Sequence, residues 1–291
     1  MFYNYLIIMI FMCLSTIGAS VSAHVDNYQE VIKTYGNDNL ADKPPFQGGY
    51  INFGYWKNIP TEDNSKISQN ERVQASFNLY KLIIDKLNIQ QSDNVLEVGC
   101  GQGYGSAYVA TEYKPHKING IDISPYQIER AKHLHSSILE QYHGLEFQTS
   151  PADALKKPNN YYDKIYSVEA AQYFPSMNNF AKEMHRILKT DGVIVFTTLF
   201  STDVNGYGAA KKLLPTVEQN IDRLIPVNDV RQAFINNGFI EIETERIGQH
   251  VFKGFDLWIS QVEDAPWGRN FYKLYKSKNI NYYVLSFKKV R

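Results

Sequence analysis

Apolar and polar positions follow two different periods along the middle of the chain. Between residues 71 and 87, apolar side chains recur at helical spacing, with polar side chains such as Arg72 between them. Short apolar runs typical of strands then alternate with helix-like segments. The expected strands are residues 95–98, 118–123, 145–148, 164–168, 193–199, 239–246 and 282–288, and the expected helices are residues 71–87, a segment from 104, 125–143, 178–189 and 228–236. Such alternation predicts an α/β fold in which helices wrap a parallel sheet.

Two segments lack this regular pattern. Residues 24–70 form an arm rich in Asn, Asp, Pro and Gly, interrupted by a cluster of aromatic rings between Tyr50 and Trp56. Because large rings are costly to leave in water, we expect the cluster either to cover a cavity or to pack on the first helix. Residues 201–225 contain two glycines and a Leu-Leu pair, a composition that suits a mobile cover over a site.

The first 23 residues have the features of a leader. Their apolar run, residues 6–17, is about 12 residues long and therefore too short to span a membrane. Val21-Ser22-Ala23 carries small side chains at alternate positions, which suits a signal peptidase that cuts before His24. Residues 1–5 lack the Lys or Arg that normally orients a leader, so an uncleaved apolar arm on the domain or on a membrane surface is the alternative.

We therefore expect three parts. These are a leader or apolar anchor at residues 1–23, an N-terminal arm at 24–70 and the main domain at 71–291, with the cover at 201–225 inside that domain. The leader predicts export of the chain, whereas an unused leader would leave it cytoplasmic or bound to a membrane. The oligomeric state stays open.

Composition excludes some partners. The 291 residues include 30 Lys plus Arg and 30 Asp plus Glu, so the formal net charge is zero. Without a global positive field the chain is not expected to bind nucleic acid. The two cysteines are Cys13, inside the leader, and Cys100, so a chain without its leader would form no internal disulfide.

A glycine-rich turn is the strongest sign of chemistry. Residues 97–103 read Glu-Val-Gly-Cys-Gly-Gln-Gly, between an expected strand and an expected helix. Glycines permit positive φ and let a ligand approach the backbone, while the amides that open the following helix can meet a polar ligand group. Asp122 ends the next strand, where its carboxylate can accept hydrogen bonds from both hydroxyls of a ribose. Together they predict a ribose-bearing ligand.

The turn and Asp122 have two other interpretations. The glycines could simply make a tight turn while Asp122 caps the helix that opens at Pro125. A dinucleotide would require Gly-x-Gly-x-x-Gly/Ala, but the last position is Tyr104 or Ser106 in the two registers. Nicotinamide-dependent oxidation is therefore disfavoured.

At these motifs the sequence resembles the class I S-adenosylmethionine-dependent methyltransferases, over most of residues 94–291. The matching segments are 94–103, 120–124 with Asp122, 151–154 with Asp153, 163–174 at the fourth strand, and 187–192, where Thr-Asp-Gly replaces the usual Pro-Gly-Gly. The resemblance implies a Rossmann-like, doubly wound, mainly parallel seven-stranded sheet with an antiparallel C-terminal strand. It implies S-adenosylmethionine as cofactor, held by Glu97, Gly99, Gly101, Gly103, Asp122, Ile123, Gln127, Ala152, Asp153, Ala154 and Tyr55.

Within that family, the chain is similar to the enzymes of small molecules such as quinones, tocopherols, sterols, polyketides and sugars. Residues 52–56, Asn-Phe-Gly-Tyr-Trp, resemble their Gly-Tyr-Trp segment, in which the arm closes over the cofactor. The resemblance places Glu169 and Tyr173 nearest the transferred methyl group, although some members carry His where this chain has Gln172 and Tyr173. His250, in a stretch with several aromatic residues, is a further candidate for a catalytic role.

Methyl transfer is an in-line displacement at an activated carbon, so the protein needs to align the acceptor and exclude water, and no metal is expected. A hydroxyl acceptor would also need a base. Apolar residues in the arm and the cover predict a partly apolar small-molecule acceptor, methylated on oxygen or carbon. The alternative function is a non-catalytic, exported domain of the same fold that binds the cofactor or a partner.

Overall fold

A seven-stranded sheet forms the centre of the computed structural model, which describes residues 28–36, 38–63, 65–262 and 266–290. The strand order is β3-β2-β1-β4-β5-β7-β6. Neighbouring strands from β3 to β5 run parallel, whereas β7 is antiparallel to both β5 and β6. The strands are β1 (Asn94–Val98), β2 (Lys117–Asp122), β3 (Leu145–Thr149), β4 (Tyr162–Val168), β5 (Leu188–Ser201), β6 (Phe239–Arg246) and β7 (Ile280–Lys289). The predicted fold class is confirmed.

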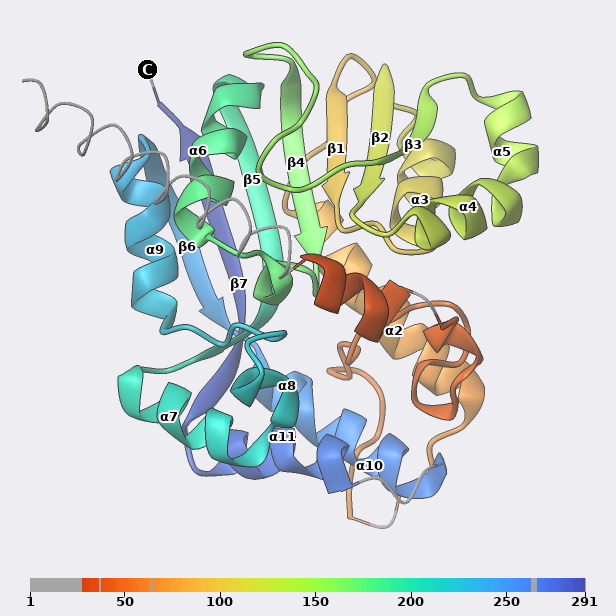
Figure 1. Cartoon of the computed structure of the whole chain (residues 1–291). Coiled ribbons are helices and arrows are strands. Elements are labelled where there is room, and N and C mark those ends of the chain that lie inside the picture. The colour runs from red at the N-terminus through yellow and green to blue at the C-terminus, as the bar shows by residue number, and fades with distance from the viewer. Residues whose placement is uncertain (1–27, 37, 64, 263–265, 291) are drawn as a thin grey trace, which may run out of the picture.

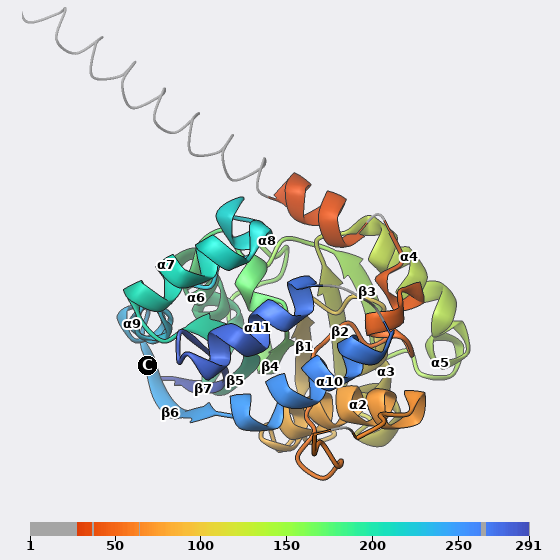
Figure 2. The ribbon, with the colours of Figure 1, turned by 90° about the horizontal axis from the view of Figure 1, so that it is seen from below.

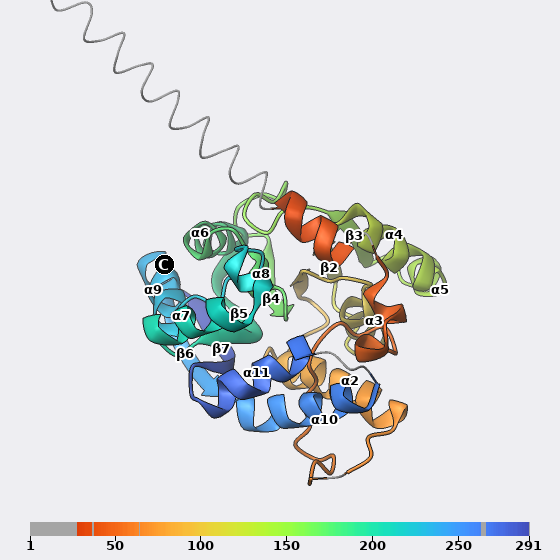
Figure 3. The same cartoon turned by 60° about the horizontal axis from the view of Figure 1, so that its bottom comes forward.

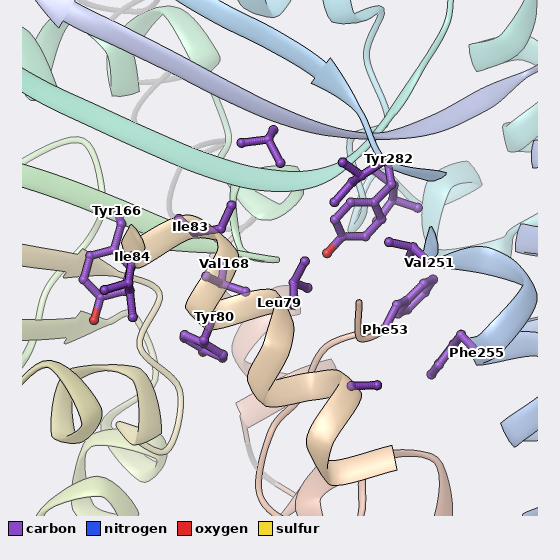
Figure 4. Close-up of a cluster of buried hydrophobic side chains, with 14 of the residues drawn as sticks. Phe53, Leu79, Tyr80, Ile83, Ile84, Tyr166, Val168, Val251, Phe255 and Tyr282 are labelled. Atoms are coloured by element: carbon purple, nitrogen blue, oxygen red, sulfur yellow. The ribbon is translucent and has the colours of Figure 1, made fainter. Parts of the chain in front are cut away.

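Helices cover both faces of this sheet (Figure 1). One face carries α6 (Met177–Ile187) and α9 (Val227–Asn236), whose rings Phe180 and Phe234 pack on Phe196 of β5. The other face carries α2 (Gln69–Asp85), α3 (Tyr104–Glu112), α4 (Pro125–Leu134) and α5 (Ser136–Gln141). Figure 4 shows part of this second core, where Ile83 of α2 lies near Val168 of β4. The sheet is therefore doubly wound, as predicted.

A group of further helices lies beyond the carboxyl ends of the parallel strands. These helices are α7 (Val204–Leu213), α8 (Pro215–Glu218), α10 (Phe252–Val262) and α11 (Pro266–Lys276). Figure 2 shows them in front of the sheet when the molecule is seen from below. The predicted cover at residues 201–225 is thus two helices and their connections, while α10 and α11 were not predicted at all. Gly254 inside α10 lets the helix approach the ring of Trp56, because a Cβ there would lie 2.3 Å from that ring.

The first predicted helix, residues 71–87, is α2, which begins and ends two residues earlier. Ser68 and Glu71 form a capping box at its start. Arg72 was predicted among the polar positions of this helix, yet it is fully buried. Its guanidinium donates hydrogen bonds to the carbonyl oxygens of Pro45 and Asn52, so it joins the helix to the arm.

The single helix predicted at residues 125–143 is interrupted. His135 leaves helical conformation between α4 and α5, and its Nε2 lies 3.0 Å from the carbonyl oxygen of Gln102. The contact ties the break to the glycine-rich turn. Local periodicity alone does not report such a contact, because it comes from a residue 33 positions away.

The N-terminal arm is mostly irregular, as predicted, but it contains helical turns at residues 28–36, Leu40–Asp42 and Pro44–Phe46. Figure 3 shows its first part, in red, beside α4. Gln127 and Arg130 of α4 donate hydrogen bonds to the carbonyl oxygens of Tyr35 and Gly36, respectively, and fasten the arm there.

The predicted leader at residues 1–23 lies outside the described residues, so export and membrane contact stay predictions. Within the part of the chain that the structure describes, no helix combines the length and apolar character needed to cross a membrane.

Candidate active site

The glycine-rich turn lies at the carboxyl end of β1. Gly99, Gly101 and Gly103 all have positive φ, which explains the choice of residue. A Cβ on Gly99 would lie 2.2 Å from the Cβ of Ala170, whereas a Cβ on Gly101 would meet nothing within 4 Å. Gly99 is therefore required for packing, and Gly101 leaves open space beside the backbone. Such space suits a ligand that presses on the turn.

Asp122 lies at the carboxyl end of β2, directly beside this turn. Its Oδ2 accepts a hydrogen bond from the N–H of Gly101, and its Oδ1 accepts one from the N–H of Ser124, both at 2.9 Å. Burial raises the pKa of Asp122, and these backbone bonds oppose the shift. Ser124, rather than Asp122, caps α4. Since a carboxylate can accept about four hydrogen bonds, Asp122 retains capacity for two ribose hydroxyls.

A cavity opens over these two strand ends, and we call it the cofactor cavity. Of the residues predicted to bind the cofactor, those that line it are Gly99, Gly101, Asp122, Ile123, Gln127 and Ala152. The arm closes it from the other side with Tyr28 and Tyr35, which were not predicted, and with Tyr50 of the predicted ring cluster. These residues fit S-adenosylmethionine, because they combine an open backbone turn, a ribose-binding carboxylate and aromatic walls.

Other predicted cofactor residues do not line this cavity. Glu97 is fully buried behind the turn, where its Oε2 accepts hydrogen bonds from Ser106 and Tyr166, and burial raises its pKa to about 7. Gly103 precedes the first turn of α3. Asp153 reaches the cavity indirectly, because it accepts a 3.1 Å hydrogen bond from the hydroxyl of Tyr28.

The two remaining predicted cofactor residues lie elsewhere. Ala154 is exposed to solvent. The ring of Tyr55 lies 5.5 Å from the ring of His250, away from the cofactor cavity. The predicted ring cluster divides its roles: Tyr50 lines the cofactor cavity, whereas Trp56 packs on α10. Tyr50 also packs on the first helix, because its ring centroid lies 5.6 Å from that of Tyr80 and 6.5 Å from that of Phe77. Both hypotheses therefore hold for Tyr50, whereas Trp56 packs on a helix that neither hypothesis named.

A second cavity, which we call the acceptor cavity, adjoins the first. It is lined by residues from the arm, the segment after β4, β5, the predicted cover and α11: Thr34, Tyr35, Leu40, Phe46, Ile51, Phe53, Glu169, Gln172, Tyr173, Leu199, Leu214, Pro215, Thr216, Asp222, Leu224, Trp267 and Phe271. Most of these side chains are apolar. The prediction that the cover helps to line a site is consistent with its contribution of Leu214 and Leu224.

Glu169 stands where the two cavities meet, directly after β4. Its Oε2 accepts hydrogen bonds from the N–H of Phe53, at 2.7 Å, and from the hydroxyl of Tyr282, at 2.6 Å. Burial raises its pKa to about 8, although Tyr282, Phe53 and the charge of Arg72 oppose the shift. No described residue forms a hydrogen bond with Oε1, so that oxygen can accept a proton.

Tyr173 also lines both cavities, and its ring centroid lies 4.6 Å from that of Tyr35. Burial raises the pKa of Tyr173 well above its usual value, so its hydroxyl stays protonated. Gln172 is held in place by hydrogen bonds to Thr198 and to the carbonyl oxygen of Glu169. Glu169 and Tyr173 thus lie together, as predicted.

His250 lies apart from both cavities. It borders a surface hollow with Trp56 and Lys57, and burial lowers its pKa. Its main-chain carbonyl accepts a hydrogen bond from the N–H of Trp56. This position gives the predicted catalytic role of His250 no support. Its aromatic neighbours in sequence belong to α10, which packs on the arm.

Within the described ranges, no three or more His, Cys, Asp and Glu side chains are grouped so that they could hold a metal ion.

Known proteins match both the sequence and the fold. Residues 96–196 match the family described as methyltransferase domain. The erythromycin 3''-O-methyltransferase of Saccharopolyspora erythraea is 24% identical over 247 residues, which are 80% of this chain and 76% of that protein. The 2-methyl-6-phytyl-1,4-hydroquinone methyltransferase of Synechocystis is 31% identical over 150 residues, which are 52% of this chain and 44% of that relative.

Among solved structures, the geranyl diphosphate C-methyltransferase of Streptomyces coelicolor matches with a TM-score of 0.75 at 11% identity, over 91% of this chain and 98% of that one. The structural match shows the fold alone, whereas the match to the methyltransferase domain is a match of sequence and covers residues 96–196. None of the comparisons supports the alternative of a non-catalytic binding domain. Residues 96–196 thus form a methyltransferase domain whose cofactor is S-adenosylmethionine, and the chain is similar to methyltransferases of small molecules.

Proposed function

We propose that this methyltransferase transfers a methyl group from S-adenosylmethionine to an oxygen or carbon atom of a partly apolar small molecule in the acceptor cavity. The observation that carries the proposal is the junction of the two cavities. The residues that line both are Tyr35, Leu40, Ile51, Glu169 and Tyr173. A cofactor in one cavity and an acceptor in the other would therefore meet beside Glu169.

S-adenosylmethionine supplies a methyl group already activated by a sulfonium, so the protein mainly has to align the acceptor and exclude water. The apolar walls of the acceptor cavity, including Phe53 and Phe271, serve both purposes. The arm restricts access of water from the other side, because Tyr28 and Tyr35 lie over the cofactor cavity. The acceptor is thus enclosed by the arm and the helices beyond the sheet.

Glu169 can take the proton that a hydroxyl acceptor loses during transfer. Its Oε2 is fixed by Phe53 and Tyr282, which leaves Oε1 without a hydrogen bond from any described residue, and Glu169 lines both cavities. Only the ionised carboxylate can act as a base. With a pKa of about 8, Glu169 is more fully ionised as pH rises, so we expect kcat/KM to increase from pH 6 to about 8.

The relatives support a partly apolar small molecule as the class of substrate, but they do not identify the acceptor of this chain. Their names refer to erythromycin and a phytyl-substituted hydroquinone, and the name of the structural match refers to geranyl diphosphate. The lining of the acceptor cavity, with Leu214, Leu224, Trp267 and Phe271, supports an acceptor that buries an apolar portion.

A labelling experiment tests the proposal. The purified full chain is incubated with S-adenosylmethionine labelled in its methyl group and with organic and aqueous extracts of the source organism. We expect label in an organic-soluble small molecule, with an equal amount of S-adenosylhomocysteine, and loss of both with Glu169→Gln. Transfer of the label to protein or nucleic acid instead would contradict the proposal, as would the absence of any transfer despite cofactor binding.

A further inference from the structure

A second carboxylate lies in the acceptor cavity, and no motif predicted it. Asp222 follows α8 in the cover and is only 7% exposed, yet it lines the cavity. The hydroxyl of Tyr35 lies 3.1 and 3.2 Å from its two carboxylate oxygens, and Thr216 donates a hydrogen bond to Oδ2. Asp222 thus joins the N-terminal arm to the cover across the cavity.

The hydrogen-bonding capacity of Asp222 is not exhausted by these contacts. Two donors, Tyr35 and Thr216, reach a carboxylate that can accept about four hydrogen bonds. The next residue, Arg223, uses its main-chain N–H to donate to the carbonyl oxygen of Gln172 at 2.7 Å, and it does not line the cavity. Room is therefore left for a donor on a ligand.

The charge of the acceptor cavity also favours a ligand that donates a hydrogen bond. Among the described residues that line it, the ionisable acids are Glu169 and Asp222, and none is Lys, Arg or His. The two acids are close enough that the charge of Asp222 adds to the rise in the pKa of Glu169. An anionic head group placed here would meet these two acids in a mostly apolar surrounding, with no basic side chain among the described lining residues to pair with it.

We propose that Asp222, with Tyr35 and Thr216, forms a hydrogen-bond-accepting subsite that selects an uncharged acceptor carrying a second hydroxyl group. The proposal rests on the proposed function, because it takes the cavity beyond Glu169 as the place of the acceptor. In this arrangement one hydroxyl faces Glu169 and the methyl donor, and a second hydroxyl donates to Asp222. Acceptors with a carboxylate or a phosphate are rejected. Asp222 therefore acts in specificity, at a distance from the transferred methyl group.

Three probes with carbon chains of the same length test this subsite: 1-octanol, 1,2-octanediol and octanoate. Each is titrated into the chain saturated with S-adenosylhomocysteine, at pH 8, where Asp222 is ionised because its pKa is about 6. We expect the diol to bind about tenfold more tightly than the alcohol, since a hydrogen bond to a charged group is among the stronger kinds, and octanoate to bind most weakly.

Asp222→Asn is the test variant, and Glu218→Gln, on the exposed side of α8, is the matched control. We expect Asp222→Asn to remove most of the advantage of the diol and to improve octanoate binding at least threefold, while Glu218→Gln retains the order of the parent chain. Tyr35→Phe, which removes one partner and keeps the carboxylate, should still disfavour octanoate. This second variant keeps the test valid if Asp222→Asn unfolds.

The outcomes separate the two proposals. Failure to bind S-adenosylhomocysteine would overturn the proposed function. If S-adenosylhomocysteine binds, three results would overturn the role of Asp222. These are octanoate binding as tightly as 1-octanol or more tightly, the diol binding no more tightly than the alcohol, and no binding of any of the three probes. An unchanged preference in Asp222→Asn would do the same.

Discussion

The cofactor cavity and the acceptor cavity are built in different ways. The first depends on backbone geometry at the ends of two adjacent strands. Gly99 and Gly101 lie in the turn after β1, and Asp122 lies at the end of β2 beside that turn. The second depends on side chains from five separate parts of the chain, from Thr34 in the arm to Phe271 in α11. The cofactor site is thus fixed by the sheet, whereas the acceptor site can change with the helices attached to the sheet.

The residues at the junction belong to both systems. Glu169 follows a strand of the sheet, but its carboxylate is positioned by Phe53 of the arm and Tyr282 of β7. Arg72 supports the same contact. The C=O of Asn52 and the N–H of Phe53 belong to one peptide group; the C=O accepts a hydrogen bond from Arg72, and the N–H donates one to Glu169. Changes at the junction should therefore affect catalysis without removing either cavity.

The largest effect is expected from Glu169→Gln. The amide oxygen can still accept hydrogen bonds from Phe53 and Tyr282, so the fold should persist, but the base is lost. We expect kcat for a hydroxyl acceptor to fall by about 10²- to 10⁴-fold and the Kd for S-adenosylmethionine to change less than about threefold. Steady-state kinetics and calorimetry give the two values, with Glu218→Gln as the control. Near-normal kcat in the variant would exclude Glu169 as the base.

A pair of glycine variants separates packing from ligand binding in the cofactor cavity. Gly99→Ala places a Cβ against Ala170 at positive φ, so we expect a loss of about 2 to 4 kcal/mol in the free energy of unfolding. Gly101→Ala meets no protein atom within 4 Å, and we expect a loss of only about 1 kcal/mol but at least a tenfold weaker affinity for S-adenosylmethionine.

Thermal unfolding and calorimetry of both glycine variants measure these effects. If Gly101→Ala binds the cofactor as tightly as the parent chain, the open space beside the turn is not where the cofactor lies. If Gly99→Ala is as stable as the parent chain, the turn does not approach Ala170 as closely as the structure shows.

A smaller effect is expected from pH and tests the acceptor cavity. Burial raises the pKa of Asp222 from 3.8 to about 6, so the folded chain keeps a proton that the unfolded chain has released. This contribution to stability is complete below about pH 4 and is lost as pH rises through about 6. Asp222→Asn should therefore gain about 1 to 3 kcal/mol relative to the parent chain between pH 4 and pH 7. Urea unfolding at both pH values provides the measurement, and a relative loss would contradict the burial of the charge.

The difference between the cavities also explains what could be predicted from the sequence. The strands, the glycine-rich turn and Asp122 are encoded within short segments, so pattern and motif located them. Asp222 and the burial of Arg72 carry no local signal, because both depend on partners from the arm. Hydrophobic spacing around Arg72 indicated a polar face, which the arm then covers.

The helices beyond the sheet were missed for a related reason. Glycines interrupt α7 and α10, which weakens any helical pattern, and in α10 the packing of Gly254 on Trp56 compensates. Tyr55 was assigned to the site through the resemblance to the Gly-Tyr-Trp segment, and His250 through its aromatic neighbours in sequence. In the fold those neighbours are buried, while His250 borders the surface hollow and its ring lies 5.5 Å from that of Tyr55.

Calorimetric titration of S-adenosylmethionine into the parent chain and into Asp122→Ala tests the central claim most directly. We expect one cofactor per chain, and a loss of affinity of about 100-fold in the variant, since two hydrogen bonds to a buried carboxylate disappear. A thermal scan of the variant checks that it is folded. A parent chain that does not bind, or a folded Asp122→Ala that binds with unchanged affinity, would contradict the claim that the cofactor lies across the ends of β1 and β2.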